Sequence, residues 1–428
     1  MNSINLHRAL LLPMLCAATL LAGAPLSASA QEEPKAELER QEPSVMMGER
    51  AYRRFNTVTE LYTADEFNKA LEAVQSYLDR QLSDYERAMG EQIYGFILIS
   101  LDRVTESIPH FERVLELDAL PNRAHFDMMR SLAQLYASRE EWQKSIDMMT
   151  EYLRYQPEPK PEDYIMMGQN YAQMNRYRDA LPWVTDAIEM AGGEAKESWY
   201  QLALAIHFEL KDFRSALGVL KTLVANWPEK LRYWETMAGA HQELNQDTDA
   251  LSALMTAYDA GLITEEKKLL NLVRTSMYVD LPYQAGQILH KAMQADQVER
   301  TQKNLKLLLQ AWTSAREYDR AGAVIDELAP LTGDGQLFIQ KARLMMEQNE
   351  WDTTVEAARA GLELGNVDKP GGAWLMIGIA EMERGNLRES RNAFQRAQDF
   401  DAKTRQQARE WQRFVEDRIQ LNELRAGR

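Results

Sequence analysis

The sequence predicts an all-α solenoid built from about ten helix pairs, and three observations lead to this fold class. From about Gly48 onward, apolar residues recur at spacings of three and four, which is the period of a helix, and strand-like alternation is rare. A pattern of large and small residues repeats about every 35 residues over most of the chain. With 14 prolines and 21 glycines among 428 residues, the chain is neither collagen-like nor dominated by linkers.

Composition limits the classes of function. Hydrophobic residues make up 45% of the chain, which is enough for a sizeable core. The formal net charge of −16 argues against a general nucleic-acid binder, because such proteins need a basic surface to displace counterions from phosphates. A single cysteine, Cys16, cannot form an internal disulfide or build a metal site alone.

The amino terminus has the pattern of a secretory signal peptide over residues 1–30. The basic Arg8 is followed by an apolar run at residues 9–22, and small residues lead to Ala28-Ser29-Ala30. The alternative, a membrane anchor, is disfavoured because a spanning helix needs about 20 apolar residues. We expect secretion to the periplasm with cleavage after Ala30, which removes Cys16. Because Cys16 lies inside the apolar run, the pattern does not predict lipidation.

The next segment, residues 31–47, is predicted to be a flexible acidic tether. Residues 31–45 contain five acids, two bases and two prolines, with little apolar content. Such a composition cannot bury enough apolar surface to offset the entropy of folding.

The repeats begin after this segment. The residue that opens each predicted second helix is small and recurs at steps of 33 to 38 residues. These residues are Ala70, Ser107, Ser145, Ala180, Ala216, Ala250, Ala285, Ala321, Thr354 and Ser390. Because one helix pair cannot bury its apolar face alone, we predict a continuous solenoid over residues 48–400. Pro109 and Pro182 each follow a small residue by two positions, so we expect them in the first turn of a helix, where proline is tolerated.

The repeat has a specific pattern. Its fullest copies are Tyr164-x2-Met167-Gly168-x2-Tyr171-x8-Ala180, Trp234-x2-Met237-Ala238-x2-His241-x8-Ala250 and Trp374-x2-Ile377-Gly378-x2-Glu381-x8-Ser390. The pattern resembles the tetratricopeptide repeat (TPR), and this resemblance implies a right-handed superhelical α-solenoid. Small residues such as Gly168 and Gly378 would let the two helices of a repeat approach closely. The charged residues 401–428 are predicted to form a C-terminal capping helix and tail.

Motifs of enzymes and cofactor sites are missing. The sequence has no phosphate-binding glycine loop, dinucleotide fingerprint, nucleophile elbow or zinc-protease motif. The histidines are not paired at metal-ligand spacing, and acid pairs such as Glu140-Glu141 have no neighbouring base or nucleophile. Met-Met pairs such as Met128-Met129 could bind a soft metal, but methionine at helical spacing is typical of core packing. We therefore expect a non-catalytic protein without cofactors.

The family resemblance also implies where a protein or peptide partner binds. In TPR proteins the first helix of each pair lines the concave face, and the matching positions here are Arg130, Gln134, Gln169, Tyr200, His207, Gln242, Arg274, Lys306, Gln310 and Arg343. Glutamines could bond the backbone of an extended peptide, and Arg274, Lys306 and Arg343 could hold its acidic groups. The alternative is that these are ordinary solvated residues on an exposed helix face.

Several strings resemble one bacterial subfamily, the periplasmic TPR proteins associated with the TonB energy-transduction system. They are Glu197-Ser198-Trp199, Glu209-Leu210-Lys211-Asp212-Phe213, Lys303-Asn304-Leu305, Ala315-Arg316-Glu317-Tyr318 and Lys369-Pro370-Gly371. The resemblance implies a non-catalytic interaction scaffold that accompanies TonB, ExbB and ExbD proteins in a Gram-negative envelope. A scaffold of another envelope machine, such as Tol-Pal or peptidoglycan assembly, is the alternative. The sequence does not indicate stoichiometry or oligomeric state.

Overall fold

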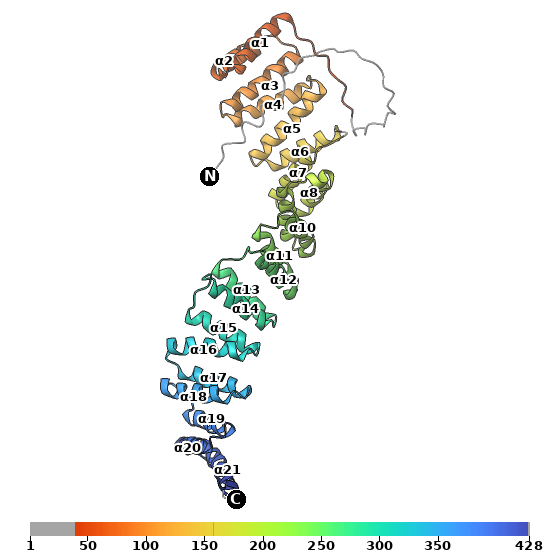
Figure 1. Ribbon diagram of the computed structural model, residues 1–428. Helices are drawn as coiled ribbons and strands as arrows, with labels where there is room; N and C mark the ends of the chain where they lie inside the picture. The colour runs from red at the N-terminus through yellow and green to blue at the C-terminus, as the bar shows by residue number, and fades with distance from the viewer. Residues whose placement is uncertain (1–38, 157, 427–428) are drawn as a thin grey trace, which may run out of the picture. The chain divides into compact units, whose positions relative to one another are not determined.

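The computed structural model describes residues 39–156 and 158–426, and within these ranges every regular element is helical. Twenty-one α-helices follow one another, with a single 3₁₀ turn, Gly192–Glu194, between α8 and α9 in chain order. The predicted fold class is confirmed, since twenty helices form successive pairs and a last helix follows them (Figure 1). The predicted signal peptide, residues 1–30, and residues 31–38 of the predicted tether lie outside the described residues.

The chain divides into two compact units, which are described separately. Unit 1 spans Met1–Ala191 and unit 2 spans Gly192–Arg428. The helices of unit 1 are α1 (Glu49–Thr63), α2 (Phe67–Leu78), α3 (Asp84–Ser100), α4 (Val104–Leu117), α5 (Asn122–Ser138), α6 (Trp142–Arg154), α7 (Pro161–Gln173) and α8 (Tyr177–Ala191). The even repeat period does not predict this division, because a period counts residues along the chain and not contacts between them.

Unit 2 contains six helix pairs and the last helix. Its members are α9 (Glu197–Glu209), α10 (Phe213–Asn226), α11 (Leu231–Glu243), α12 (Asp247–Asp259), α13 (Glu266–Tyr278), α14 (Pro282–Gln294), α15 (Gln302–Ser314), α16 (Tyr318–Thr332), α17 (Gly335–Glu347), α18 (Trp351–Leu364), α19 (Pro370–Glu383), α20 (Leu387–Ala397) and α21 (Ala402–Ala426). A core cluster runs through its repeats from Leu204 to Met345 and includes the buried Trp312.

Each helix pair turns at one residue in the left-handed backbone region. These ten residues are Asp65, Asp102, Glu140, Asn175, Lys211, Asn245, Asp280, Arg316, Asn349 and Gly385, and their φ angles are positive. Each one precedes by five positions the small residue that defines the repeat. Asp, Asn and Gly tolerate this conformation best, and they occupy most of these turns.

The small residues at the repeat positions pack where the two helices of a pair meet. All ten, from Ala70 to Ser390, have a relative exposure of 0%. In two pairs the small residue is a serine that joins the helices directly. The hydroxyl of Ser145 donates to the carbonyl of Ala133 at 2.7 Å, and that of Ser390 donates to the carbonyl of Gly378 at 2.7 Å. The repeat period of the sequence therefore marks the positions at which the two helices of each pair are in buried contact.

The predicted role of Gly168 and Gly378 is confirmed. A Cβ atom at Gly168 would lie 2.4 Å from Cγ2 of Val184, and one at Gly378 would lie 2.4 Å from Cε1 of Phe394. Both distances are shorter than carbon atoms can approach without displacement, so neither position has room for a side chain.

The predicted position of the two prolines was wrong. Helix α4 begins at Val104 and α8 begins at Tyr177, so Pro109 and Pro182 are the sixth residues of their helices and lie beyond the first turn. A proline at this depth leaves the carbonyl four residues earlier without its helical donor. Both helices nevertheless continue to their ends, because the packing of each pair outweighs one missing hydrogen bond.

Helix α21 follows the last pair and packs on it. Val415 of α21 is fully buried, and the ring of Trp411 stacks on Phe394 of α20 with 6.1 Å between ring centroids. On another side of the helix, Phe414 and Leu421 are exposed. None of the helices in the described part of the chain combines the length and apolar character needed to cross a membrane.

Candidate functional site

All ten residues predicted to contact a partner lie on the first helices of their pairs. In unit 1, Arg130 and Gln134 belong to α5 and Gln169 belongs to α7. The other seven are in unit 2, from Tyr200 on α9 to Arg343 on α17. The two groups are on different units, so they are considered as two separate sets.

The side chain of Arg130 is engaged inside unit 1. Its Nε donates to Oδ1 of Asp163 at 2.5 Å, and the carboxylate of Asp163 is completely buried. The other carboxylate oxygen of Asp163 accepts from the backbone N–H of Lys160 at 3.2 Å and lies 3.5 Å from the hydroxyl of Tyr152. Arg130 therefore links two repeats through a buried carboxylate, and its side chain remains 29% exposed.

Tyr200 and His207 on α9 also pack within their own unit. Tyr200 is half-buried against the core of unit 2, with its ring 6.2 Å from the ring of Trp227. His207 is buried, and its Nδ1 lies 3.5 Å from Oδ2 of Asp212. Burial lowers the pKa of His207, and the nearby Asp212 opposes this shift only in part. A buried neutral imidazole packs the repeat and offers no charge to a ligand.

The remaining predicted residues are accessible. Gln134 is half-buried, and the exposed ones are Gln169, Gln242, Arg274, Lys306, Gln310 and Arg343. Arg274, Lys306 and Arg343 form no ion pair or hydrogen bond with any residue that the structure describes. They lie on α13, α15 and α17, the first helices of three consecutive repeats.

Two further cations share the exposed side of these helices. Lys267 on α13 and Lys303 on α15 are exposed and lack partners among the described residues. We call Lys267, Arg274, Lys303, Lys306 and Arg343 the basic face. Lys267 lies seven residues before Arg274, and Lys303 lies seven before Gln310, so each pair of positions is on one side of its helix. This spacing is visible in the sequence, and sequence reasoning missed both lysines because it followed only the positions of the family pattern.

The charge balance of α13, α15 and α17 differs from that of the whole chain. These helices contain seven Lys and Arg residues and two acids, Glu266 and Glu347, for a formal charge of 7 − 2 = +5. The whole chain has a formal charge of −16. The two other cations are paired, Lys268 with Glu235 at 3.1 Å and Lys341 with Asp326 at 2.6 Å.

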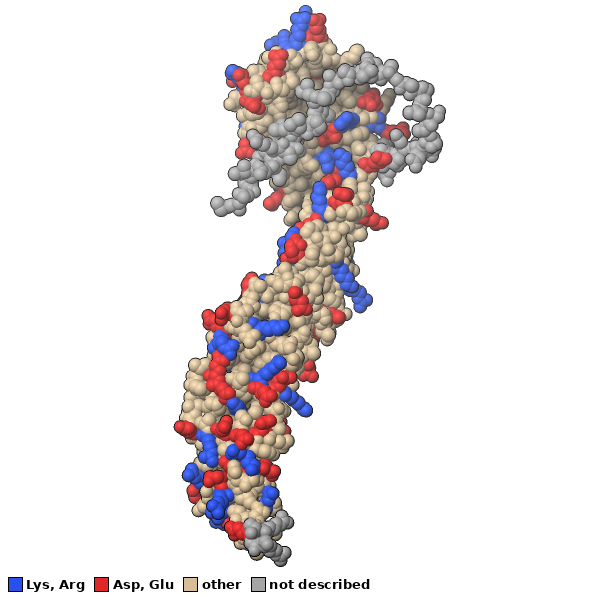
Figure 2. Space-filling model, viewed as in Figure 1, with Lys and Arg blue, Asp and Glu red and all other residues tan. Residues whose placement is uncertain are grey.

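Basic and acidic side chains are interspersed over much of the surface seen in Figure 2. Several cations elsewhere in the chain form ion pairs within one helix, such as Arg113 with Glu116 of α4 at 2.8 Å. The five cations of the basic face form no such pair with any described residue, and what sets them apart is that they lie on the first helices of three consecutive repeats whose formal charge is positive. A cation without an intramolecular partner keeps its full attraction for a ligand, because no ion pair must first be broken.

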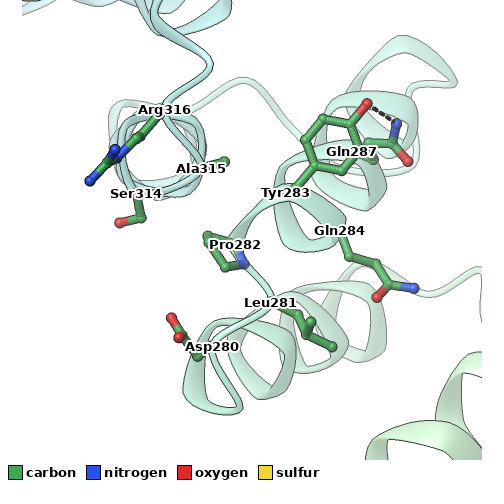
Figure 3. A pocket seen from close by; sticks show the side chains of 9 residues that line it. All are labelled: Asp280, Leu281, Pro282, Tyr283, Gln284, Gln287, Ser314, Ala315 and Arg316. Atoms are coloured by element: carbon green, nitrogen blue, oxygen red, sulfur yellow. Dashed lines mark hydrogen bonds between the residues drawn. The ribbon is translucent and has the colours of Figure 1, made fainter.

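Two open hollows occur in unit 2. The larger, of about 580 Å³, lies between the α13–α14 and α15–α16 turns and is lined by Asp280, Leu281, Pro282, Tyr283, Gln284, Gln287, Ser314, Ala315 and Arg316. Figure 3 shows the Tyr283 hydroxyl near Gln287, whose Nε2 donates to it at 2.9 Å. One carboxylate and one guanidinium are the charged groups of this lining, and it contains no histidine or cysteine.

The smaller hollow, of about 330 Å³, lies between α9 and α11. Its apolar side chains include Leu204, Ala205 and Phe208, and its polar ones include Gln201, Arg232 and Thr236. Arg232 is held by Oε1 of Glu197 at 3.1 Å and stacks over the Tyr233 ring at 4.7 Å. Among the residues that the structure describes, no group of three or more His, Cys, Asp or Glu is arranged to hold a metal ion.

No protein-family model matches the chain, and no curated protein matches it either. Solved structures that are similar include a tetratricopeptide repeat protein from Parabacteroides merdae, with a TM-score of 0.36 and 13% identity over 62% of this chain and 99% of that chain. YrrB, described as a TPR protein with an unusual peptide-binding site, has a TM-score of 0.35 and 16% identity over 44% of this chain and 92% of its own. The TPR domain of P58(IPK) has a TM-score of 0.24 and 11% identity over 87% of this chain and 99% of its own.

Proposed function

We propose that the chain is a non-catalytic scaffold that binds an extended acidic segment of a protein partner along the basic face. The observation that carries this proposal is the set of five exposed cations on α13, α15 and α17, none of which has a partner among the described residues. Such an arrangement in a chain of net charge −16 favours an acidic ligand over a basic one.

The neighbouring polar groups suit an extended chain. Gln310 is exposed at the helix position equivalent to Arg274 and Arg343, so an amide lies in the same row as two guanidinium groups. An amide can both donate to and accept from a peptide backbone, and guanidinium groups form two-pronged hydrogen bonds with carboxylates. Successive helices therefore offer backbone recognition and charge recognition along one direction.

We further propose that the partner belongs to a TonB, ExbB and ExbD type of system in the periplasm. The secretory pattern of residues 1–30 and the resemblance of the strings quoted above to periplasmic TonB-associated proteins support this assignment. In-cell photocrosslinking from position 310, followed by identification of the captured envelope proteins, tests it. Capture of TonB, ExbB or ExbD would support the assignment, whereas capture of Tol-Pal or peptidoglycan-assembly proteins would replace it with the alternative.

A charge-reversal experiment tests the basic face independently of the partner's name. The triple variant R274E, K306E and R343E should lose crosslinking at position 310 while its circular dichroism stays unchanged. The control triple variant R214E, K221E and K291E makes the same charge change at exposed residues of second helices α10 and α14. Undiminished capture by the first variant, or equal loss in both, would contradict specific recognition by the basic face.

A physiological test addresses the TonB assignment. Deletion of the gene should slow growth when a chelated form is the sole iron source, and the intact gene should restore the rate. A normal growth rate under this condition, with the uptake transporters expressed, would count against a role in TonB-dependent uptake.

A further inference from the structure

The described part of the predicted tether is bound to the repeats of unit 1. We call residues 39–48 the strap, and Figure 1 draws it as the trace that leads into α1. Its last residue, Gly48, donates its backbone N–H to Oε1 of Glu86 on α3 at 2.7 Å. Near its other end, the side chain of Arg40 is only 8% exposed. The composition of this segment predicts a solvated chain, and the burial of Arg40 is therefore unexpected.

The guanidinium of Arg40 is surrounded by acceptors from the turn between α4 and α5. Nε donates to Oδ1 of Asp118 at 2.7 Å, and Nη2 donates to the Asp118 carbonyl at 2.9 Å. Nη1 donates to the carbonyl of Leu120 at 3.0 Å and to Oδ1 of Asn122 at 2.5 Å. Four acceptors within five consecutive residues match the fixed directions of the guanidinium donors.

The same turn also binds the strap away from the guanidinium. Nδ2 of Asn122 donates to the backbone carbonyl of Arg40 at 3.0 Å, and the backbone N–H of Asn122 donates to Oε1 of Glu42 at 3.2 Å. Recognition therefore includes a backbone group and a second side chain of the bound segment. We call Asp118, Leu120 and Asn122 the arginine site.

The local fold holds these acceptors in place. Helix α4 ends at Leu117, and the left-handed φ of 46° at the next residue, Asp118, turns the chain away from the helix. Because the last carbonyls of a helix lack intrahelical donors and carry partial negative charge, this end favours a cation. Ala119 and Leu120 are buried, which fixes the backbone carbonyls of the turn.

A neighbouring histidine leaves Asp118 available to the arginine. His125 on α5 is buried, and its Nδ1 lies 3.6 Å from Oδ1 of Asp118. Burial and the charge of Arg40 lower the pKa of His125, and the carboxylate of Asp118 opposes these effects. A neutral imidazole does not compete with the guanidinium for the carboxylate.

An ordinary surface ion pair does not account for this arrangement. Exposed pairs involve two solvated side chains and contribute little to stability. Here the Asp118 side chain is 64% exposed, but the Arg40 side chain is only 8% exposed and its acceptors are about 80 residues away in the sequence. Desolvating a guanidinium is costly, so its burial requires the full set of acceptors that this turn provides.

We propose that the α4–α5 turn is a binding site for an extended, arginine-bearing segment supplied by a partner, and that the strap occupies this site as an internal ligand. The partner segment would place its guanidinium among the acceptors of the arginine site and displace Arg40. This site selects a cation, whereas the basic face selects acidic groups, so the two sites require different ligands. The arginine site is in unit 1 and its argument does not depend on the proposed function of unit 2.

The test uses the full chain with Arg40→Ala, which removes the guanidinium from the arginine site and leaves this part of the strap held by its contacts with Asn122, and a labelled peptide of residues 39–47. Fluorescence anisotropy should show that this variant binds the peptide at least about ten-fold more tightly than the intact chain does, because Arg40 occupies the site in the intact chain. The same peptide with R40A should bind the Arg40→Ala chain at least about ten-fold more weakly. Arg40→Lys provides a second receptor that keeps the positive charge but loses the guanidinium geometry.

Two receptor substitutions complete the test. Asp118→Asn, added to Arg40→Ala, should weaken peptide binding about ten-fold while the turn persists, since Asn tolerates the left-handed conformation. Glu116→Gln removes a nearby exposed carboxylate of α4 and should leave binding unchanged. The proposal is overturned if neither receptor binds the peptide, if both peptides bind alike, or if Asp118→Asn and Glu116→Gln have the same effect.

Discussion

Replacing Arg130 by alanine should destabilise unit 1 and leave partner binding in unit 2 unchanged. The substitution removes the 2.5 Å hydrogen bond from Nε of Arg130 to Asp163, whose carboxylate has no exposed surface. A hydrogen bond to a charged group contributes about 1.5–3 kcal/mol. Loss of one partner of a fully buried ion pair costs about 3–5 kcal/mol, but Arg130 is 29% exposed and Asp163 keeps the N–H of Lys160 at 3.2 Å. We therefore expect a loss of about 2 kcal/mol.

Thermal unfolding of the full chain, followed by circular dichroism, measures this loss. For a unit of this size, about 2 kcal/mol corresponds to a fall in Tm of about 4–8 °C. Hydrogen exchange should locate the change in α5 to α7, because repeats couple mainly to their neighbours. Arg123→Ala, an exposed residue of the same helix, is the control and should change stability by less than about 0.5 kcal/mol. Equal effects of the two substitutions would refute the assignment of Arg130 to a buried ion pair.

Three other predictions concern the glycines, the turns and the pH dependence of stability. A Cβ at Gly335 would lie 2.2 Å from the carbonyl oxygens of Gly361 and Gly365, so Gly335→Ala should lower the unfolding free energy by at least about 2 kcal/mol. Gly239 has open space around it, so Gly239→Ala should stabilise α11 by up to about 1 kcal/mol. Thermal unfolding of both variants checks this pair. Lys211 has a positive φ, a conformation that glycine adopts without the steric cost of a Cβ. Lys211→Gly should therefore raise the unfolding free energy measured in urea by about 0.5–1 kcal/mol. A loss of stability would show that the contacts of the lysine side chain outweigh the relief of backbone strain. Hydrogen bonds from Lys230 and Tyr233 lower the pKa of Glu197 to about 2. The contribution of the Glu197 carboxylate to stability is therefore complete above its ordinary pKa of 4.5 and disappears as pH falls toward 2. The difference in unfolding free energy between the native chain and Glu197→Gln should shrink over that window, and a constant difference would contradict this origin.

The positions of the small repeat residues were predictable because they depend on side-chain volume. A second helix can approach the first only where both side chains are small, so ten small residues at an even spacing predict ten buried contacts, and all ten are buried. Lys267 and Lys303 were also within reach of sequence reasoning, since a spacing of seven places them on the helix side of Arg274 and Gln310.

The failures have a different origin. Pro109 and Pro182 were placed by their distance from a small residue, but the start of a helix depends on its turn and its packing. Arg130 matches the position that faces a partner in the family pattern, yet Asp163 of the next repeat engages it. Whether a polar side chain is free depends on a residue 33 positions away, and no local pattern reports that pairing.

The sequence by itself determined the all-α repeat, the number of helix pairs and the positions where each pair packs, because these follow from side-chain volume and helical period. Only the tertiary structure decided which polar groups are available. It engages Arg130 with Asp163, buries Arg40 among the acceptors of the α4–α5 turn, and leaves Arg274, Lys306 and Arg343 without partners among the residues that the structure describes. The physical reason is that an ion pair or hydrogen bond forms between groups that folding brings within about 3 Å, and their separation along the chain carries little information about that distance.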